Sequence, residues 1–299
     1  MPTITATIPT PVRAVAAADF VNKTPRSTRP PMLRLSPSRA ADFAACELKY
    51  RFIALDKIRA PRSVAALRGI VVHKVLEELF AVAPAQRTRA TAAALVTPVW
   101  EHITADPDLG VAEDEIRADP SVVDDLLIGV HALVDAYFEL EDPALVTVAG
   151  REKRLYARLG QELALTGIAD RIDNLGGDTV GVIDYKTGTA PQTPDEQSAA
   201  VWQLKFYALI WWRSRGVAPS WVRLLYPGSG RTITYTPDEG ELADFQATVS
   251  ALAAQITRAI ATGVFTANPS AACGMCDFQR SCPASIPAPP PAASASEAV

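Results

Sequence analysis

Three residues that can do chemistry lie in two apolar stretches of strand length near the middle of the chain. The first stretch contains Asp170, and the second contains Asp184 and Lys186, two positions apart. Because side chains alternate faces along a strand, Asp184 and Lys186 project from the same side. If the stretches pair as a hairpin across residues 174–178, Asp170 comes near that side too. Two carboxylates that hold Mg²⁺ or Mn²⁺, with an ammonium beside them, suit hydrolysis of a phosphodiester.

Four further residues can complete such a site. His73 lies among valines and leucines at helical spacing, where a histidine is more often a core residue, but its imidazole can also coordinate manganese. Glu152 opens the strand before Asp170 and can join the metal shell or remain an exposed charge. Gln203 and Tyr207 stand at positions i and i+4, so they share a helix face and can contact a phosphate or brace the lysine.

The four cysteines of the chain form a second candidate site. They are Cys46, far upstream, and the C-terminal series Cys273, Cys276 and Cys282. Zinc and an iron–sulfur cluster both accept four thiolates. One Cys-x-x-Cys pair with two single cysteines fits a cluster better, without deciding the matter. Such a site would clamp the N-terminal helical part onto the end of the chain, so we expect it to be structural.

The composition indicates a globular protein with a substantial core, since 48% of the 299 residues are hydrophobic and 21% are charged. A net charge of −4 argues against nucleic-acid binding by bulk charge. The charge is uneven, however. Residues 23–68 hold eleven Lys and Arg against three acids, whereas residues 101–150 hold thirteen acids and one base, Arg117. A local basic face is therefore compatible with the acidic total, although solvated helical surface explains either segment.

The sequence gives no sign of membrane insertion or export. No stretch approaches the roughly 18 apolar residues of a membrane helix. The N-terminus lacks the basic and apolar regions of a secretory signal. We therefore expect a cytoplasmic protein that does not contact membranes, in a compartment where structural disulfides are rare.

Periodicity predicts the elements that must position these residues. Residues 1–31 and 284–299 are rich in Pro, Ala, Thr or Ser and are expected to be disordered. One folded domain is expected at 32–283, with a helical part at 36–142, a core at 145–262 and the cysteine cluster at 273–282 with Cys46. The helical part begins with Ser36 and Pro37, a good N-cap and first-turn pair.

Within these parts the expected elements follow one another as helices, strands, a helix, strands and a final helix. Helices are predicted around 71–79 and at 121–140, 196–215 and 239–262. Strands are predicted at 145–148, 153–159, 163–175 and 180–185, with a hairpin over 221–235. The fold class is therefore α/β, with a mixed central sheet flanked by helices.

Taken in order, the motifs resemble the RecB-like branch of the PD-(D/E)XK nuclease superfamily over residues 35–283. They are Ser-x-Ser at 36–38 before the first cysteine, Gly-x-x-x-His at 69–73, Glu152, Gly-x-x-Asp at 167–170, Asp-Tyr-Lys at 184–186, Gln-x-x-x-Tyr at 203–207 and three closing cysteines. The cysteine spacing is similar to that of the iron–sulfur nucleases related to AddB and to the CRISPR adaptation nucleases.

The resemblance implies a restriction-endonuclease-like core, a DNA substrate and a [4Fe–4S] cluster rather than zinc on the four cysteines. It assigns His73, Asp170 and Asp184 to the metal, Lys186 to catalysis, and Gln203 with Tyr207 to the DNA groove. Glu47 departs from the Pro that many relatives have after the first cysteine, with little expected effect on helix geometry.

The function that follows is a Mg²⁺- or Mn²⁺-dependent DNA exonuclease of repair and recombination that prefers single strands or ends. The sequence contains no Gly-x-x-x-x-Gly-Lys-Ser/Thr phosphate loop, so any unwinding would need a separate helicase subunit. Two alternatives stay open. One is a non-catalytic iron–sulfur DNA-binding subunit of a helicase–nuclease complex, and the other is a zinc-stapled interaction protein whose acids are surface charges.

Overall fold

The computed structural model describes residues 32–58, 63–105, 119 and 121–284. The expectations for residues 1–31 and for the tail beyond Ala284 lie outside this part of the chain. So do the basic residues Arg59, Arg62 and Arg117, together with residues 106–118 and 120 of the acidic segment.

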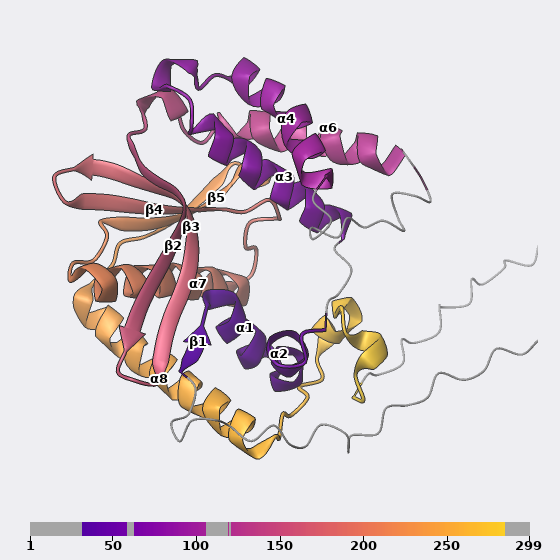
Figure 1. The fold of residues 1–299 in the computed structure, drawn as a ribbon, viewed down its shortest axis with the longest axis vertical. Coiled ribbons are helices and arrows are strands. Elements are labelled where there is room, and N and C mark those ends of the chain that lie inside the picture. The colour runs from indigo at the N-terminus through magenta and orange to yellow at the C-terminus, as the bar shows by residue number, and fades with distance from the viewer. Residues whose placement is uncertain (1–31, 59–62, 106–118, 120, 285–299) are drawn as a thin grey trace, which may run out of the picture. The chain divides into compact units, whose positions relative to one another are not determined.

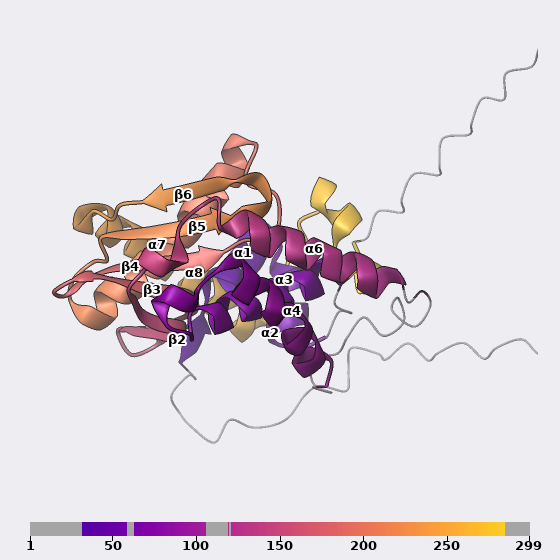
Figure 2. The ribbon, with the colours of Figure 1, turned by 90° about the horizontal axis from the view of Figure 1, so that it is seen from above.

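A six-stranded mixed sheet forms the centre of the fold, in the order β1-β3-β4-β5-β6, with β2 also paired to β3 (Figure 1). Figure 2 shows the strands following one another from β6 to β2. Their bounds are β1 Leu33–Leu35, β2 Val148–Leu159, β3 Leu163–Gly176, β4 Thr179–Tyr185, β5 Trp221–Tyr226 and β6 Arg231–Tyr235. The pairs β1–β3 and β4–β5 are parallel, and the others are antiparallel. The predicted α/β class with a mixed sheet is confirmed.

The long strand β3 is paired differently along its two edges. Strand β2 occupies one edge from Leu163 to Asp173. On the other edge β1 pairs only as far as Leu165, and β4 pairs only from Arg171 onward. Residues 166–170 therefore have no strand partner on that edge, and we call this stretch the gap in β3. Its backbone polar groups must find partners elsewhere.

Helices cover both faces of the sheet (Figure 1). Their bounds are α1 Pro37–Ala45, α2 Glu47–Ala54, α3 Val64–Leu79, α4 Arg89–Thr104, α6 Ser121–Tyr137, α7 Pro194–Arg215 and α8 Glu239–Thr262. Short 3₁₀ helices lie at Pro84–Gln86, Pro143–Leu145, Pro227–Ser229, Ala271–Met275 and Gln279–Ser281.

The two helical layers contact alternate residues of the strands. Helices α1, α2, α7 and α8 share a core with Val182 and Leu224, whereas α3, α4 and α6 pack on Ile183, Tyr185 and Leu225. Neighbouring residues of β4 and β5 thus face opposite layers, as the two-residue period of a strand requires.

Local signals explain where the helices begin and end. The Ser36 hydroxyl accepts the Arg39 N–H and Pro37 follows directly, so α1 starts at the predicted cap. Helix α7 begins with a capping box between Thr193 and Glu196, and it ends at Gly216 in the left-handed conformation.

The sequence analysis missed one strand and placed another wrongly. Strand β1 was not predicted, because three residues are too few to show a period and their only partner is the distant strand β3. A strand was predicted at 145–148, but Pro143–Leu145 is a 3₁₀ helix and β2 begins at Val148. Pro143 favours the turn, since proline fixes φ and cannot donate to a sheet ladder. The predicted helices at 196–215 and 239–262 correspond to α7 and α8.

None of the helices in the described part of the chain combines the length and apolar character needed to span a bilayer.

Candidate active site

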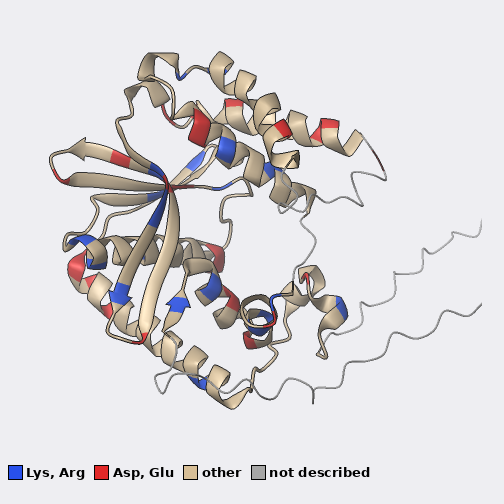
Figure 3. Cartoon of the chain, viewed as in Figure 1, with Lys and Arg blue, Asp and Glu red and all other residues tan. Residues whose placement is uncertain are grey.

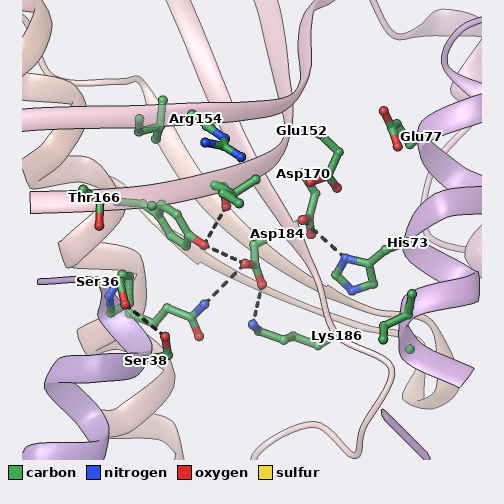
Figure 4. A pocket seen from close by; sticks show the side chains of 18 of the residues that line it. Ser36, Ser38, His73, Glu77, Glu152, Arg154, Thr166, Asp170, Asp184 and Lys186 are labelled. Atoms are coloured by element: carbon green, nitrogen blue, oxygen red, sulfur yellow. Dashed lines mark hydrogen bonds and ion pairs between the residues drawn. The ribbon is translucent and has the colours of Figure 1, made fainter. Parts of the chain in front are cut away.

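A cavity of about 1100 Å³ lies beside the gap in β3 (Figure 4). It is lined by elements from four parts of the sequence: β1 with the start of α1, helix α3, strands β2 to β4 with the residues directly after β4, and α7. All seven residues predicted for the site line it, namely His73, Glu152, Asp170, Asp184, Lys186, Gln203 and Tyr207. The fold therefore brings together every residue that the sequence analysis assigned to the phosphodiester site.

Asp184 is buried near the end of β4 and is held from two sides. Its Oδ1 accepts hydrogen bonds from the Tyr207 hydroxyl at 3.0 Å and from the Gln203 amide at 3.3 Å. Its Oδ2 lies 2.5 Å from the Lys186 ammonium, in an ion pair that lacks hydrogen-bond alignment. Burial raises the pKa of the Asp184 carboxyl, and the charge of Lys186 opposes this rise. As predicted from strand alternation, Asp184 and Lys186 share one side.

Tyr207 connects this acid to the gap in β3. Its hydroxyl lies 2.8 Å from the Ile168 carbonyl oxygen and 3.0 Å from Asp184 Oδ1. The hydroxyl thereby makes a hydrogen bond to the Ile168 carbonyl, which lies in the gap in β3. Gly167 makes the close approach of α7 possible, because a Cβ there would lie 3.0 Å from the Tyr207 ring. Close packing against α7 thus explains why the Gly-x-x-Asp motif begins with glycine.

The Asp170 side chain links β3 to the end of β4, where the two strands have no backbone–backbone hydrogen bond. Its Oδ2 accepts the backbone N–H of Tyr185 at 2.6 Å, and its Oδ1 lies 3.3 Å from His73 Nδ1. One oxygen of the carboxylate therefore fixes the end of β4, which carries Asp184 and Lys186. The other oxygen faces α3 and the cavity (Figure 4).

His73, Glu152 and Asp170 form a group that can hold a divalent cation, since one ligand atom of each lies within 4.8 Å of the others. Both the strand pattern and the resemblance had placed Asp184 in this shell, and the residues alone had left the role of Glu152 open. In the structure Glu152 joins the group, while Asp184 contacts Lys186, Gln203 and Tyr207.

The electrostatics of this group favour a cation. Burial raises the pKa of Glu152 to about 6, and the charge of Asp170 adds to the rise. Burial alone lowers the pKa of His73, but its hydrogen bond to Asp170 and the nearby carboxylates outweigh burial, so the net shift is upward. Neighbouring carboxylates contribute to both shifts, and a divalent ion would offset their negative charge. Glu152 also has φ +43°, an uncommon conformation for a residue other than glycine.

The glycine of the Gly-x-x-x-His motif also has a physical reason. A Cβ at Gly69 would lie 3.0 Å from the Thr187 hydroxyl, directly after Lys186 in the chain. Helix α3 therefore packs closely against the segment that follows β4, and this contact sets His73 one turn further along the helix beside Asp170.

Sequence reasoning missed other residues of the cavity wall. Arg154, Tyr156, Thr166 and Ile168 also line it. The signal that could have found Arg154 and Tyr156 is the two-residue period that starts at Glu152, because these side chains must share its face of β2.

The four cysteines line a second cavity, of about 270 Å³. Among the described residues, however, no three of their sulfur atoms lie within 4.8 Å of one another. A single zinc ion with bonds of about 2.3 Å would need sulfurs roughly 3.8 Å apart. The expectation of a tight cysteine cluster is therefore corrected: the thiols share a cavity without forming a close group.

The C-terminal segment is held against α1 and α2 by contacts that need no thiol. The Glu47 carboxylate accepts the Thr266 N–H at 2.8 Å, and the Asn268 side chain donates to the Ala45 carbonyl at 3.0 Å. Phe278 packs against Phe52 with ring centroids 5.5 Å apart. Glu47, for which only a small effect on helix geometry was expected, also ties α2 to the C-terminal segment.

The comparisons with known proteins agree with this geometry. The profile of the PD-(D/E)XK nuclease superfamily matches residues 34–283. A crystal structure from Eubacterium rectale, described as a "putative exonuclease", is similar over 82% of this chain and 86% of its own, with a TM-score of 0.52 and 12% identity. At that identity the likeness concerns the fold alone.

A second solved structure, of the protein SSO0001, covers 58% of this chain and 75% of its own at 19% identity, with a TM-score of 0.30 that carries no argument. No curated protein sequence matches the chain. The superfamily match spans the sheet, the cavity and all seven predicted residues, and the chain therefore belongs to the PD-(D/E)XK nuclease superfamily.

Proposed function

We propose that this protein is a metal-dependent DNA exonuclease that hydrolyses phosphodiester bonds and prefers single strands or ends. One observation carries the proposal: three potential metal ligands and an Asp–Lys pair line the same cavity in a nuclease fold. The single-strand preference and a role in DNA repair rest on the resemblance to the RecB-like branch.

The donors present fit the proposed metal. His73 offers an imidazole nitrogen, and Glu152 and Asp170 offer carboxylate oxygens, a set that suits Mg²⁺ or Mn²⁺. When bound, such an ion supplies Lewis-acid polarisation of the phosphate and makes water a better nucleophile.

The side chains of the Asp–Lys pair supply the remaining chemistry. The Lys186 side chain is about one-third exposed and lines the cavity, where its ammonium can orient the attacking water and stabilise charge that develops on the phosphate. Asp184 holds this ammonium in place, and Tyr207 with Gln203 fixes Asp184. A phosphate that enters the cavity is thus met by a pre-positioned cation.

The first test is cleavage of end-labelled single-stranded DNA by anaerobically purified protein with Mn²⁺, beside Asp170→Ala. We expect the wild type to release short products and EDTA to abolish the release. We expect Asp170→Ala to lose at least about 100-fold in rate, because it removes a metal ligand and the partner of the Tyr185 N–H.

Equal cleavage by wild type and variant would reveal a contaminating nuclease. Tight DNA binding without cleavage in Mg²⁺ or Mn²⁺ would overturn the catalytic proposal in favour of a non-catalytic DNA-binding subunit.

We further propose that the chain belongs to the RecB-like iron–sulfur branch, with a [4Fe–4S] cluster on Cys46, Cys273, Cys276 and Cys282. All four thiols line one cavity, which supports a shared group, and a multi-iron cluster spans a wider set of sulfurs than one zinc ion does. A cluster there would join α1 and α2 to the C-terminal segment. We also propose a separate helicase subunit as the source of any DNA unwinding.

We expect Cys46→Ser to lose iron and visible absorption and to melt at a lower temperature than wild type, because metal binding contributes to folding. Iron and acid-labile sulfide analysis of anaerobic protein checks this. Met275→Leu is the control. Met275 lines the same cavity and is 89% exposed, and its thioether sulfur is not a thiolate ligand. Stoichiometric zinc in place of iron would contradict the proposal.

A further inference from the structure

The face of β2 that continues from Glu152 is uncovered and carries an unusual row of side chains. Leu155 and Ala157 are buried beneath the strand, so the even-numbered residues point the other way. Those residues are Arg154, Tyr156 and Arg158, all exposed. The Tyr156 side chain is 44% exposed, a large aromatic surface left to solvent beside a candidate active site.

The neighbouring strands extend this row into a surface. In the register of β2 and β3, Ile168 lies opposite Arg154, and Thr166 lies opposite Tyr156. Ala164 lies opposite Arg158 and also pairs with Arg34 of β1. We define the β2 track as Arg34, Arg154, Tyr156, Arg158, Thr166 and Ile168.

The β2 track is continuous with the candidate active site. All of its residues except Arg158 line the same cavity as Asp170 and Asp184. In Figure 4, Arg154 and Thr166 lie on the side of Asp184 away from His73. From Glu152 to Arg158 the strand covers roughly 20 Å, at about 3.4 Å per residue. A DNA strand that is cleaved beside Asp170 and Asp184 must continue along a neighbouring surface. The β2 track is such a surface, since it starts beside these two residues.

The charge of the track is free for a ligand. Figure 3 shows Lys and Arg at intervals along β2 and on β1. None of the ion pairs within the described part of the chain involves Arg34, Arg154 or Arg158. Exposed guanidiniums without an acidic partner complement phosphates, which they bind bidentately.

We propose that the β2 track holds a single strand of DNA beside the cleavage site, with the guanidiniums on phosphates and a base stacked on Tyr156 and Ile168. Stacking on a side chain requires an exposed base face, which a single strand offers and a duplex interior does not. The inference rests on the proposed nuclease function and names the part of the substrate that this surface takes.

The test compares binding of a fluorescent oligo-dT with binding of an abasic oligonucleotide of equal length, by anisotropy in EDTA so that neither is cleaved. We expect Tyr156→Ala to weaken oligo-dT binding by roughly 5- to 100-fold and to change abasic binding far less, because only oligo-dT has bases to stack. Tyr156→Phe keeps the ring and is expected to retain wild-type affinity.

Charge is tested with a matched pair on the same strand. We expect Arg154→Gln to weaken both oligonucleotides and to reduce the slope of log affinity against log salt by about 0.7, the value for one lost phosphate contact on a single strand. Lys153→Gln is the control, because Lys153 is exposed but does not line the cavity. It is expected to leave both affinities and the slope unchanged.

Three outcomes would overturn the inference. They are wild-type protein that does not bind oligo-dT, Tyr156→Ala that binds it as wild type does, and Tyr156→Ala that weakens both oligonucleotides equally while its melting temperature is unchanged. The proposed function fails differently, through absence of metal-dependent cleavage by a wild type that binds DNA. If the wild type cleaves DNA and Tyr156→Ala binds oligo-dT as the wild type does, the proposed role of the β2 track is wrong and the proposed nuclease function stands.

Discussion

Lys186→Ala is expected to lower DNA cleavage by at least about 100-fold, the loss typical of removing one group that stabilises charge in a transition state. The Lys186 ammonium lies 2.5 Å from Asp184 Oδ2 and lines the cavity, so it is placed for chemistry. DNA affinity in EDTA is expected to stay within about threefold of wild type, because one lysine is a small part of the phosphate contacts. Initial rates with Mn²⁺ and anisotropy in EDTA separate the two effects.

Lys205→Ala is the matched control for this prediction. Lys205 also pairs with a carboxylate at 2.5 Å, that of Glu241, but it does not line the cavity. Its loss is expected to leave both rate and affinity unchanged. Parallel loss of binding and cleavage in Lys186→Ala would mean that the lysine serves DNA binding, and the assigned catalytic role would be wrong.

Arg171→Met is expected to lower the free energy of unfolding by about 3–5 kcal/mol, because it leaves the carboxylates of a buried ion-pair network without their cation. Arg171 is 1% exposed and pairs with Glu141 at 2.5 Å and with Asp173 at 2.6 Å. Its guanidinium also donates to the Tyr185 hydroxyl at 2.8 Å and stacks over Phe80. Urea unfolding followed by circular dichroism measures the loss as a shift of the midpoint relative to wild type.

The comparison that makes this result specific is Arg89→Met. Arg89 also bridges two carboxylates, those of Asp135 and Glu139, but on the surface between α4 and α6. Exposed ion pairs contribute little to stability, so its midpoint is expected to match wild type. An Arg171→Met midpoint equal to that of Arg89→Met would show that the buried network adds nothing to folding.

The Arg171 network also bears on the candidate site. Tyr185, which the guanidinium holds by its hydroxyl, gives its backbone N–H to Asp170. Asp184 and Lys186 flank it in the chain. The buried face of β4 thus positions the residues on its other face.

Local alternation was sufficient to predict the central part of the site. The two-residue period places Asp184 and Lys186 on one side and Tyr185 in the opposite layer, and both placements are observed. The caps at Ser36 and Thr193 likewise depend on residues within one turn, so the sequence signals them directly.

The features that sequence reasoning missed depend on contacts between distant segments. The gap in β3 arises because β1 and β4 divide one edge of the strand, which no local pattern signals. The left-handed conformation of Glu152 is likewise not readable from a glutamate in a strand pattern. Cysteine spacing predicted that the four thiols lie in one region of the fold. The distances between them depend on how the C-terminal segment packs on α1 and α2, where Glu47 and Asn268 make hydrogen bonds.

The pairing of β1 with β3 has a consequence for the order in which the protein becomes active during synthesis. Arg34 leaves the ribosome early, yet its partner Ala164 follows only after all of the helices up to α6. A nascent chain that stops before Glu152 lacks every acid and the lysine of the proposed site. Contacts between such distant segments form late in folding. The proposed hydrolytic activity therefore requires that β3 has been made and has paired with β1, and a chain that stops before Glu152 lacks the residues for it.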